Sequence, residues 1–150
     1  MTQDNKPDIQ LDPRGYRFGA SVTLAIAIIA LLVGSGLAGV IVMAVLALMF
    51  LPGATVGPQA TIQSAIFKRA IRPRLGAPKE TESFRPPRFA QQMGLGFSIL
   101  AVIFGALSVP AGFFIFAGFV TVASFLNSVF GFCLGCEIYL LAKRATTRSA

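Results

Sequence analysis

Residues 18–51 read FGASVTLAIAIIALLVGSGLAGVIVMAVLALMFL and contain no charged side chain. Gly34-Ser35-Gly36 divides this stretch into two apolar runs, which we place at 18–34 and 37–52. A helix of about 20 apolar residues crosses a bilayer, so the second run is near the short limit. A tight turn between two such runs predicts a pair of membrane-spanning helices.

A second pair of apolar runs lies at 90–109 and 113–131, with Pro110-Ala111-Gly112 between them. The 13 lysines and arginines lie before the first run, between the second and third runs, and after the fourth. Basic residues beside membrane spans stay on the cytoplasmic side. The sequence therefore predicts an all-α integral membrane protein of the inner (plasma) membrane. Its four transmembrane helices form two hairpins, and both termini lie in the cytoplasm.

The segments outside the runs are predicted to lie on the cytoplasmic side. Residues 1–17 form a tail, 53–88 a loop, and 132–150 a terminal helix and tail. Within the loop, 59–72 has the pattern of an amphipathic helix in the membrane interface. Its apolar face would consist of Ile62, Ala65, Ile66, Phe67 and Ile71, and its polar face of Gln63, Lys68 and Arg72. The prolines and charges of 73–87 predict loop structure.

The last apolar stretch, 113–142, is too long for one helix at the usual tilt. We therefore expect the chain to break between Asn127 and Gly135. The halves of the chain also look alike. Arg17-Phe18-Gly19 opens the first run and Arg88-Phe89-Ala90 the third, which suggests a repeat about an axis along the membrane normal.

Composition narrows the classes of function. The chain is 55% hydrophobic, carries a net charge of +7 and has no histidine. Without imidazole it lacks the usual general base and the commonest zinc ligand. The basic residues are placed on the predicted cytoplasmic side, where they can bind anionic lipid headgroups. The expected partner is therefore the lipid bilayer rather than a nucleic acid. We expect no cofactor and no nucleic-acid partner.

The chemistry-bearing motif is Cys133-Leu134-Gly135-Cys136, which holds the only two cysteines. Three interpretations stay open: thiol or sulfur chemistry, close packing of small side chains, and metal binding. A metal is disfavoured because two thiolates are half a site, although a symmetric homodimer would supply four. For thiol chemistry, Cys133 near a helix start is the attacking thiol and Cys136 the resolving one.

Two further polar residues lie near this motif. Glu137 either tunes the thiols and relays a proton, or pairs with Arg69, Arg72 or Arg88 at the inner surface. Asn127 is the only amide deep within a run, and a hydrogen bond to a neighbouring helix is its expected role.

Several short motifs together resemble a known family. They are Asp12-Pro13-Arg14-Gly15, Arg17-Phe18-Gly19, Arg72-Pro73-Arg74-Leu75-Gly76, Pro86-Pro87-Arg88-Phe89-Ala90, and Asn127 with Phe130-Gly131-Phe132-Cys133-Leu134-Gly135-Cys136-Glu137. The chain resembles, over 12–144, the actinobacterial membrane family designated domain of unknown function 4395. One departure is 57–61, where relatives are more basic. Genes of that family lie near those of rhodanese-like sulfurtransferases and thioredoxin-like proteins, so the resemblance implies sulfur or thiol chemistry and no established activity.

The favoured hypothesis is a small inner-membrane thiol protein that works with a thioredoxin-like or rhodanese-like soluble partner. Its C-x-x-C would carry out thiol–disulfide or persulfide chemistry on the cytoplasmic side. One rival is a transporter or channel subunit for a small sulfur species. The other is a structural subunit of a membrane complex, without chemistry.

Overall fold

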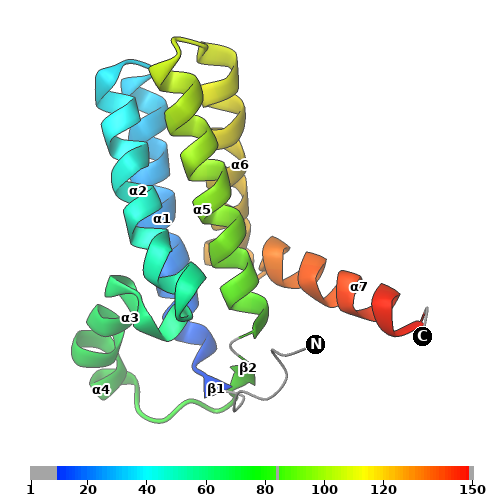
Figure 1. Ribbon diagram of the computed structural model, residues 1–150. Coiled ribbons are helices and arrows are strands. Elements are labelled where there is room, and N and C mark those ends of the chain that lie inside the picture. The colour runs from blue at the N-terminus through cyan, green and yellow to red at the C-terminus, as the bar shows by residue number, and fades with distance from the viewer. Residues whose placement is uncertain (1–9, 84, 149–150) are drawn as a thin grey trace.

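The computed structural model describes residues 10–83 and 85–148, and four long helices dominate it. They are α1 (Pro13–Val33), α2 (Leu37–Thr55), α5 (Arg85–Ala106) and α6 (Pro110–Phe130). Each is long and apolar enough to cross a membrane. Figure 1 shows them side by side, with the α1–α2 and α5–α6 turns at the same end. The prediction of four spans in an all-α protein is confirmed.

The first and third helices start earlier than the apolar runs do. α1 begins at Pro13 rather than near residue 18, and α5 begins at Arg85 rather than at 90. Proline is tolerated in the first turn of a helix, where its missing N–H would have no intrahelical partner. Pro86 and Pro87 therefore lie inside α5, and the prediction of loop structure through residue 87 is wrong.

The segment after α2 is a chain of short helical pieces. These are η1 (Pro58–Ala60), α3 (Ile62–Ile66), η2 (Phe67–Ile71, a π-helix) and α4 (Arg72–Leu75). The helix predicted at 59–72 is therefore present and continues through Pro73 to Leu75. Its predicted faces are partly wrong. Gln63 is buried beside Phe67 at 6% exposure, whereas Ile62 is 59% exposed.

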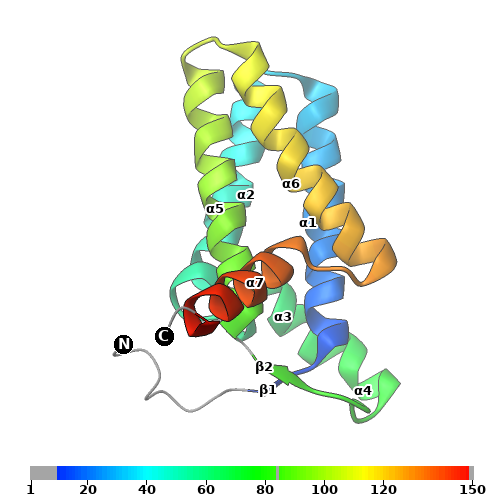
Figure 2. The same cartoon turned by 90° about the vertical axis from the view of Figure 1, so that its right-hand side faces the viewer.

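Two short strands join the starts of the two halves. β1 (Gln10–Leu11) pairs antiparallel with β2 (Glu82–Ser83), with Gln10 opposite Ser83. Figure 2 shows this ladder below the bundle, where α1 and α5 begin. The sequence analysis missed it, because two-residue strands carry no periodic pattern.

The last apolar stretch breaks where expected. α6 ends at Phe130, and Gly131 adopts the left-handed conformation, with φ 67° and ψ 15°. Its N–H donates to the Asn127 carbonyl at 3.1 Å, as in a common helix C-cap. The chain resumes as α7 (Leu134–Arg148), which leaves the bundle axis and packs beside α5 (Figures 1 and 2).

The packed core occupies the half of the bundle nearer the two turns. Its buried members are Ala27, Ala30, Met43, Leu46, Phe50, Ala101, Phe113, Ala117 and Val120. Small residues let the helices approach closely there. A Cβ on Gly105 would lie 2.5 Å from the Val40 side chain. Many large apolar side chains face outward instead, as expected for helices that contact lipid.

The two halves make equivalent contacts, as a repeat requires. α1 packs mainly on α6, and α2 mainly on α5. Arg17 of α1 donates to the Ser128 carbonyl near the end of α6. Arg88 of α5 donates to the Thr55 carbonyl at the end of α2. Each half therefore supplies the cation that caps the second long helix of the other half.

Candidate functional site

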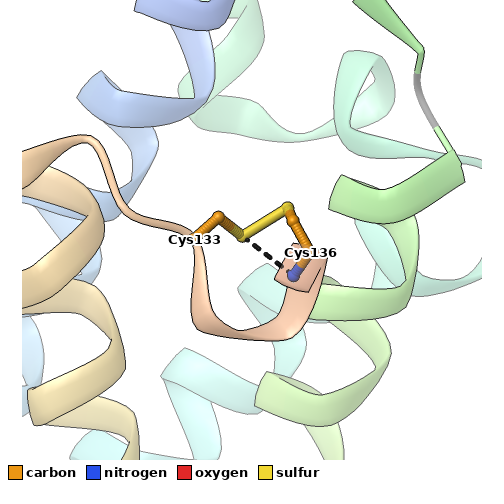
Figure 3. Close-up of a disulfide and its surroundings, with 2 residues drawn as sticks. All are labelled: Cys133 and Cys136. Carbon is orange, nitrogen blue, oxygen red and sulfur yellow. Dashed lines mark hydrogen bonds between the residues drawn. A yellow bond between two sulfur atoms is a disulfide. The ribbon is translucent and has the colours of Figure 1, made fainter. Parts of the chain in front are cut away.

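The C-x-x-C lies at the start of α7, immediately after the break. Cys133 and Cys136 are disulfide-bonded in this structure, with Cα atoms 5.1 Å apart. The Cys136 N–H donates to Cys133 Sγ at 3.3 Å (Figure 3). Both cysteines are half-buried. The Cα separation is within the range that a disulfide requires.

Cys133 occupies the capping position of α7. Its carbonyl accepts the Glu137 N–H at 3.0 Å, and its sulfur accepts the N–H three residues along. This is the bonding pattern of a helix N-cap, with sulfur in place of the usual oxygen. At a helix start, an N–H directed at a cysteine sulfur and the helix dipole are both features that stabilise a thiolate over a thiol.

The dithiol is held against the start of α5 by close packing. A Cβ on Gly135 would lie 2.7 Å from Ala90 Cα, so no larger residue fits there without moving α7. One turn later, the Tyr139 ring lies 5.7 Å from the Phe89 ring, between centroids. The glycine inside the motif therefore places both sulfurs close to the bundle.

A cavity of about 310 Å³ begins at the dithiol and extends between α1, α5, α6 and α7. Cys133, Leu134, Gly135 and Ile138 line its α7 side. The remaining wall consists of Tyr16, Gly19, Ala20, Thr23, Phe50, Pro87, Ala90, Gln91, Met93, Gly94, Phe97, Phe119, Val120, Val122, Ala123, Ser124 and Asn127. The lining is mostly apolar. No local sequence pattern predicts this cavity, because its wall comes from five separate helices, α1, α2, α5, α6 and α7.

The family model for domain of unknown function 4395 (DUF4395) matches residues 11–144, which is nearly the whole chain. This chain belongs to the DUF4395 family. No curated protein and no solved structure matches it. The DUF4395 region covers all four long helices and the C-x-x-C, so the candidate site lies within the family domain.

Two expectations about polar neighbours need correction in this DUF4395 protein. Glu137 is exposed, and within the described residues it forms no ion pair with Arg69, Arg72 or Arg88. Asn127 does not use its side-chain oxygen to bridge helices. That Oδ1 is buried and has no hydrogen-bond partner in the described part of the chain, and the residue lines the cavity.

A second, more polar cavity of about 220 Å³ lies beside the first half of the DUF4395 domain. Gln59 and Gln63 line it, and their Oε1 atoms are buried without a partner among the described residues. Lys68 and Arg72 are also in its wall. Tyr16, Gly19 and Gln91 line both cavities, so the two adjoin. Sequence reasoning missed it, because it placed Gln63 on the solvent face.

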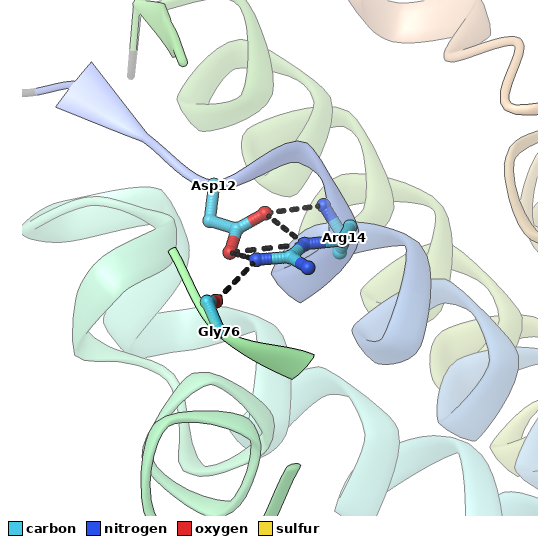
Figure 4. A network of polar contacts seen from close by, with 3 residues as sticks. All are labelled: Asp12, Arg14 and Gly76. Carbon is cyan, nitrogen blue, oxygen red and sulfur yellow. Dashed lines mark hydrogen bonds and ion pairs between the residues drawn. The ribbon is translucent and has the colours of Figure 1, made fainter. Parts of the chain in front are cut away.

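An ion pair fixes the start of α1 next to this polar cavity. Asp12 accepts hydrogen bonds from the backbone and side chain of Arg14, which also donates to the Gly76 carbonyl at 3.1 Å (Figure 4). The side-chain bond with Arg14 holds the pKa of Asp12 below its usual value, against an opposing effect of burial. Asp12 is thus an ionised N-cap of α1.

Within residues 10–83 and 85–148, no three histidine, cysteine, aspartate or glutamate residues gather into a group that could hold a metal ion. The two sulfurs stand alone as the reactive groups beside the apolar cavity. What they offer is two-electron chemistry between a dithiol and a disulfide.

Proposed function

We propose that this protein is a thiol–disulfide protein of the bacterial inner membrane, with Cys133 and Cys136 as its reactive pair. The observation that carries the proposal is the capped geometry of Cys133. Its sulfur accepts an N–H at the start of α7 and lines a cavity. A cysteine present only for packing has no need of either feature.

The dithiol is proposed to face the cytoplasm. The support is the distribution of basic residues over the three-dimensional fold. The starts of α1 and α5, the segment from α3 to α4, and α7 all carry lysine or arginine, whereas the two turns at the opposite end carry none. By the positive-inside rule, the basic end is cytoplasmic and both termini are inside.

The reaction is an exchange between thiolate and disulfide. The Cys133 thiolate attacks a partner's disulfide, a mixed disulfide forms, and one partner sulfur leaves as a thiolate. Cys136 then attacks Cys133, so the Cys133–Cys136 bond forms and the second partner sulfur leaves. With a persulfide, Cys133 takes the terminal sulfur, and Cys136 releases it as hydrosulfide. A thioredoxin-like or rhodanese-like protein of the cytosol is the proposed partner.

The rival functions have less support. Transport requires a path across the bundle, but fully buried side chains such as Phe113, Met43 and Leu46 fill the half nearer the turns. A purely structural role does not explain why Cys133 borders an open cavity rather than a neighbouring helix.

A trapping experiment tests the proposal. Cys136→Ser removes the resolving thiol, so the protein should hold a mixed disulfide when mixed with purified oxidised thioredoxin. Cys133→Ser is the matched control and should trap much less. In inverted vesicles, a membrane-impermeant maleimide should label the reduced wild-type protein. If neither thiol is labelled from that side and Cys136→Ser traps nothing, the thiol function is rejected.

A further inference from the structure

The apolar cavity has aromatic walls next to the sulfur. The Phe97 and Phe119 rings lie 5.5 Å apart, between centroids, and both line the cavity. Its volume of about 310 Å³ is at the lower end of the range of small-molecule sites, roughly 300–1,000 Å³. Flat apolar rings pack well against such walls. The cavity therefore suits a planar apolar molecule rather than a polar thiol substrate.

Access to this cavity is from the side of the bundle. Phe119 is 52% exposed and Val122 is 55% exposed, and both belong to the cavity wall. Ile138 of α7 is exposed beside them. Phe119 and Val122 belong to α6, one of the four helices long and apolar enough to cross a membrane, so they lie on a surface that faces lipid. A molecule dissolved in the bilayer therefore reaches this wall of the cavity without crossing water.

One polar group in the wall lacks a partner. The buried Asn127 Oδ1 forms no hydrogen bond within residues 10–83 and 85–148. A buried amide left unpaired costs free energy, so such groups normally meet a partner. A carboxamide both donates and accepts. The unpaired atom here is the oxygen, which accepts, so it suits a ligand hydroxyl, which donates.

We propose that the cavity binds the ring of a lipid-soluble quinone, which oxidises the Cys133–Cys136 dithiol. The proposal rests on the thiol function above, with the exchange run in the direction in which a reduced partner reduces the Cys133–Cys136 disulfide. The quinone is then the acceptor that oxidises the resulting dithiol again. Thiol exchange between soluble proteins needs no membrane. Cys133 lies in the wall of this apolar cavity and Cys136 is bonded to it, so the pair gains access to an oxidant that only the membrane holds.

The reaction balances without another reagent. Two S–H bonds break and one S–S bond forms, so the sulfurs lose two electrons. The quinone ring takes those electrons, and its two oxygens take the two protons to give the quinol. The Asn127 Oδ1 accepts a hydrogen bond from the quinol hydroxyl after the transfer.

The experiment uses the full-length protein, reduced and then freed of reductant without oxygen. The probe is decylubiquinone, whose fully substituted ring does not add thiols irreversibly. We expect one quinone reduced for every two maleimide-reactive thiols lost. Cys136→Ser should reduce none, because it cannot form the intramolecular disulfide.

Two substitutions on α6 locate the reaction. Ala123→Phe fills the cavity, whereas Ala111→Phe places the same bulk at an exposed position near the turns. We expect Ala123→Phe to slow quinone reduction at least about tenfold, equivalent to about 1.4 kcal/mol. Ala111→Phe should stay close to wild type. Asn127→Leu should raise the KM for quinone. Asn127→Gln keeps a carboxamide and should have a KM between those of wild type and Asn127→Leu.

Exchange with oxidised glutathione separates the two levels of the proposal. Exchange without quinone reduction overturns the quinone site and leaves the thiol function standing. If the wild-type protein neither exchanges with oxidised glutathione nor reduces quinone, the thiol function itself is rejected. Quinone reduction at the wild-type rate in Ala123→Phe also overturns the site, as does a lipid acyl chain in the cavity that quinone does not displace.

Discussion

The first half of the chain, residues 10–75, and the second half, 82–148, share one architecture and differ in chemistry. Phe18 packs on Phe67 in the first half, and Phe89 packs on Tyr139 in the second. Thr61 caps α3 by accepting the Ser64 N–H at 3.1 Å. Cys133 caps α7 by accepting the Cys136 N–H in the same way. The hydroxyls of one half therefore correspond to the thiols of the other.

Side chains beside these caps make the two cavities different. In the first half, Gln63 packs against Gly19. At the equivalent place in the second half, Gly135 packs against Ala90. A glutamine leaves a buried amide and a polar cavity, whereas a glycine lets α7 close on α5 beside an apolar one. The scaffold is common to both halves, and the side chains that line each cavity make one polar and the other apolar.

Matched glycine substitutions should give the largest contrast between the halves. In Gly135→Ala, the new Cβ would lie 2.7 Å from Ala90 Cα, so α7 must move, which costs about 1–3 kcal/mol. In Gly19→Ala, the nearest atom is Gln63 Cβ at 3.6 Å, an ordinary contact. At that position, the higher helix propensity of alanine should stabilise α1 by up to about 1 kcal/mol. Hydrogen exchange of α7 and α1 amides measures both. Equal effects would mean that the halves pack alike.

Removal of the reciprocal caps should have the next largest effect. Arg88→Ala frees the Thr55 carbonyl and removes one of two donors to the Ala54 carbonyl, which keeps Gln92, and should destabilise by about 1–2 kcal/mol. Arg17→Ala frees only the Ser128 carbonyl, which it meets at 3.3 Å, and should cost less. Thermal unfolding in detergent measures the difference. Arg88→Lys keeps the charge. If this variant also unfolds at a lower temperature than wild type, the geometry of the guanidinium cap is the cause.

The hydroxyl cap should accept a second dithiol. In the double variant Thr61→Cys/Ser64→Cys, the backbone geometry is equivalent to that of Cys133 and Cys136, so a disulfide should form. It would be detected as two additional thiols that react only after treatment with reductant. If Cys133 and Cys136 are then replaced by serine, quinone reduction should fall below about a tenth of wild type, because the adjoining cavity is polar. Quinone reduction at the wild-type rate in that variant would show that any dithiol at a helix N-cap can reduce quinone. The difference in polarity between the two cavities would then have no effect on the reaction.

The smallest effect concerns the starts of the halves. Asp12 caps α1, and Ser83 accepts the Arg85 N–H at the start of α5. Since the pKa of Asp12 is lowered in the folded protein, its carboxylate stabilises the fold above the usual pKa of about 3.9. That contribution disappears as pH falls through the folded value. Asp12→Ser should therefore cost about 0.5–1 kcal/mol at neutral pH, and the gap to wild type should close in acid. A pH-independent gap would assign the effect to packing.

The parts of this fold that were predictable from sequence are those that depend on local composition. The apolar runs gave the four spans, and Gly131 in an overlong run gave the break before α7. The parts that were missed depend on contacts between distant residues. The pairing of Gln10 with Ser83, the burial of Gln63 beside α1 and both cavities arise only when segments far apart in the sequence meet.

The same division holds for the candidate site. The spacing of Cys133 and Cys136 predicted their proximity, because one helical turn brings them together. Their cavity was not predictable, since Phe97, Phe119 and Asn127 come from two other helices. Proline misled in one place, where Pro86 and Pro87 were taken as a loop although the first turn of a helix accepts them.

The exchange of caps between the halves has a consequence for synthesis on the ribosome. When α2 leaves the exit tunnel, Arg88 is still to be translated, so the Ala54 and Thr55 carbonyls must be satisfied by water. The first hairpin therefore reaches the membrane with one helix end unfinished and completes it only after the third helix arrives. Conversely, Arg17 cannot bond the Ser128 carbonyl until α6 has been made. Neither half matures alone, and two separately expressed halves should accumulate only when both are made in the same cell.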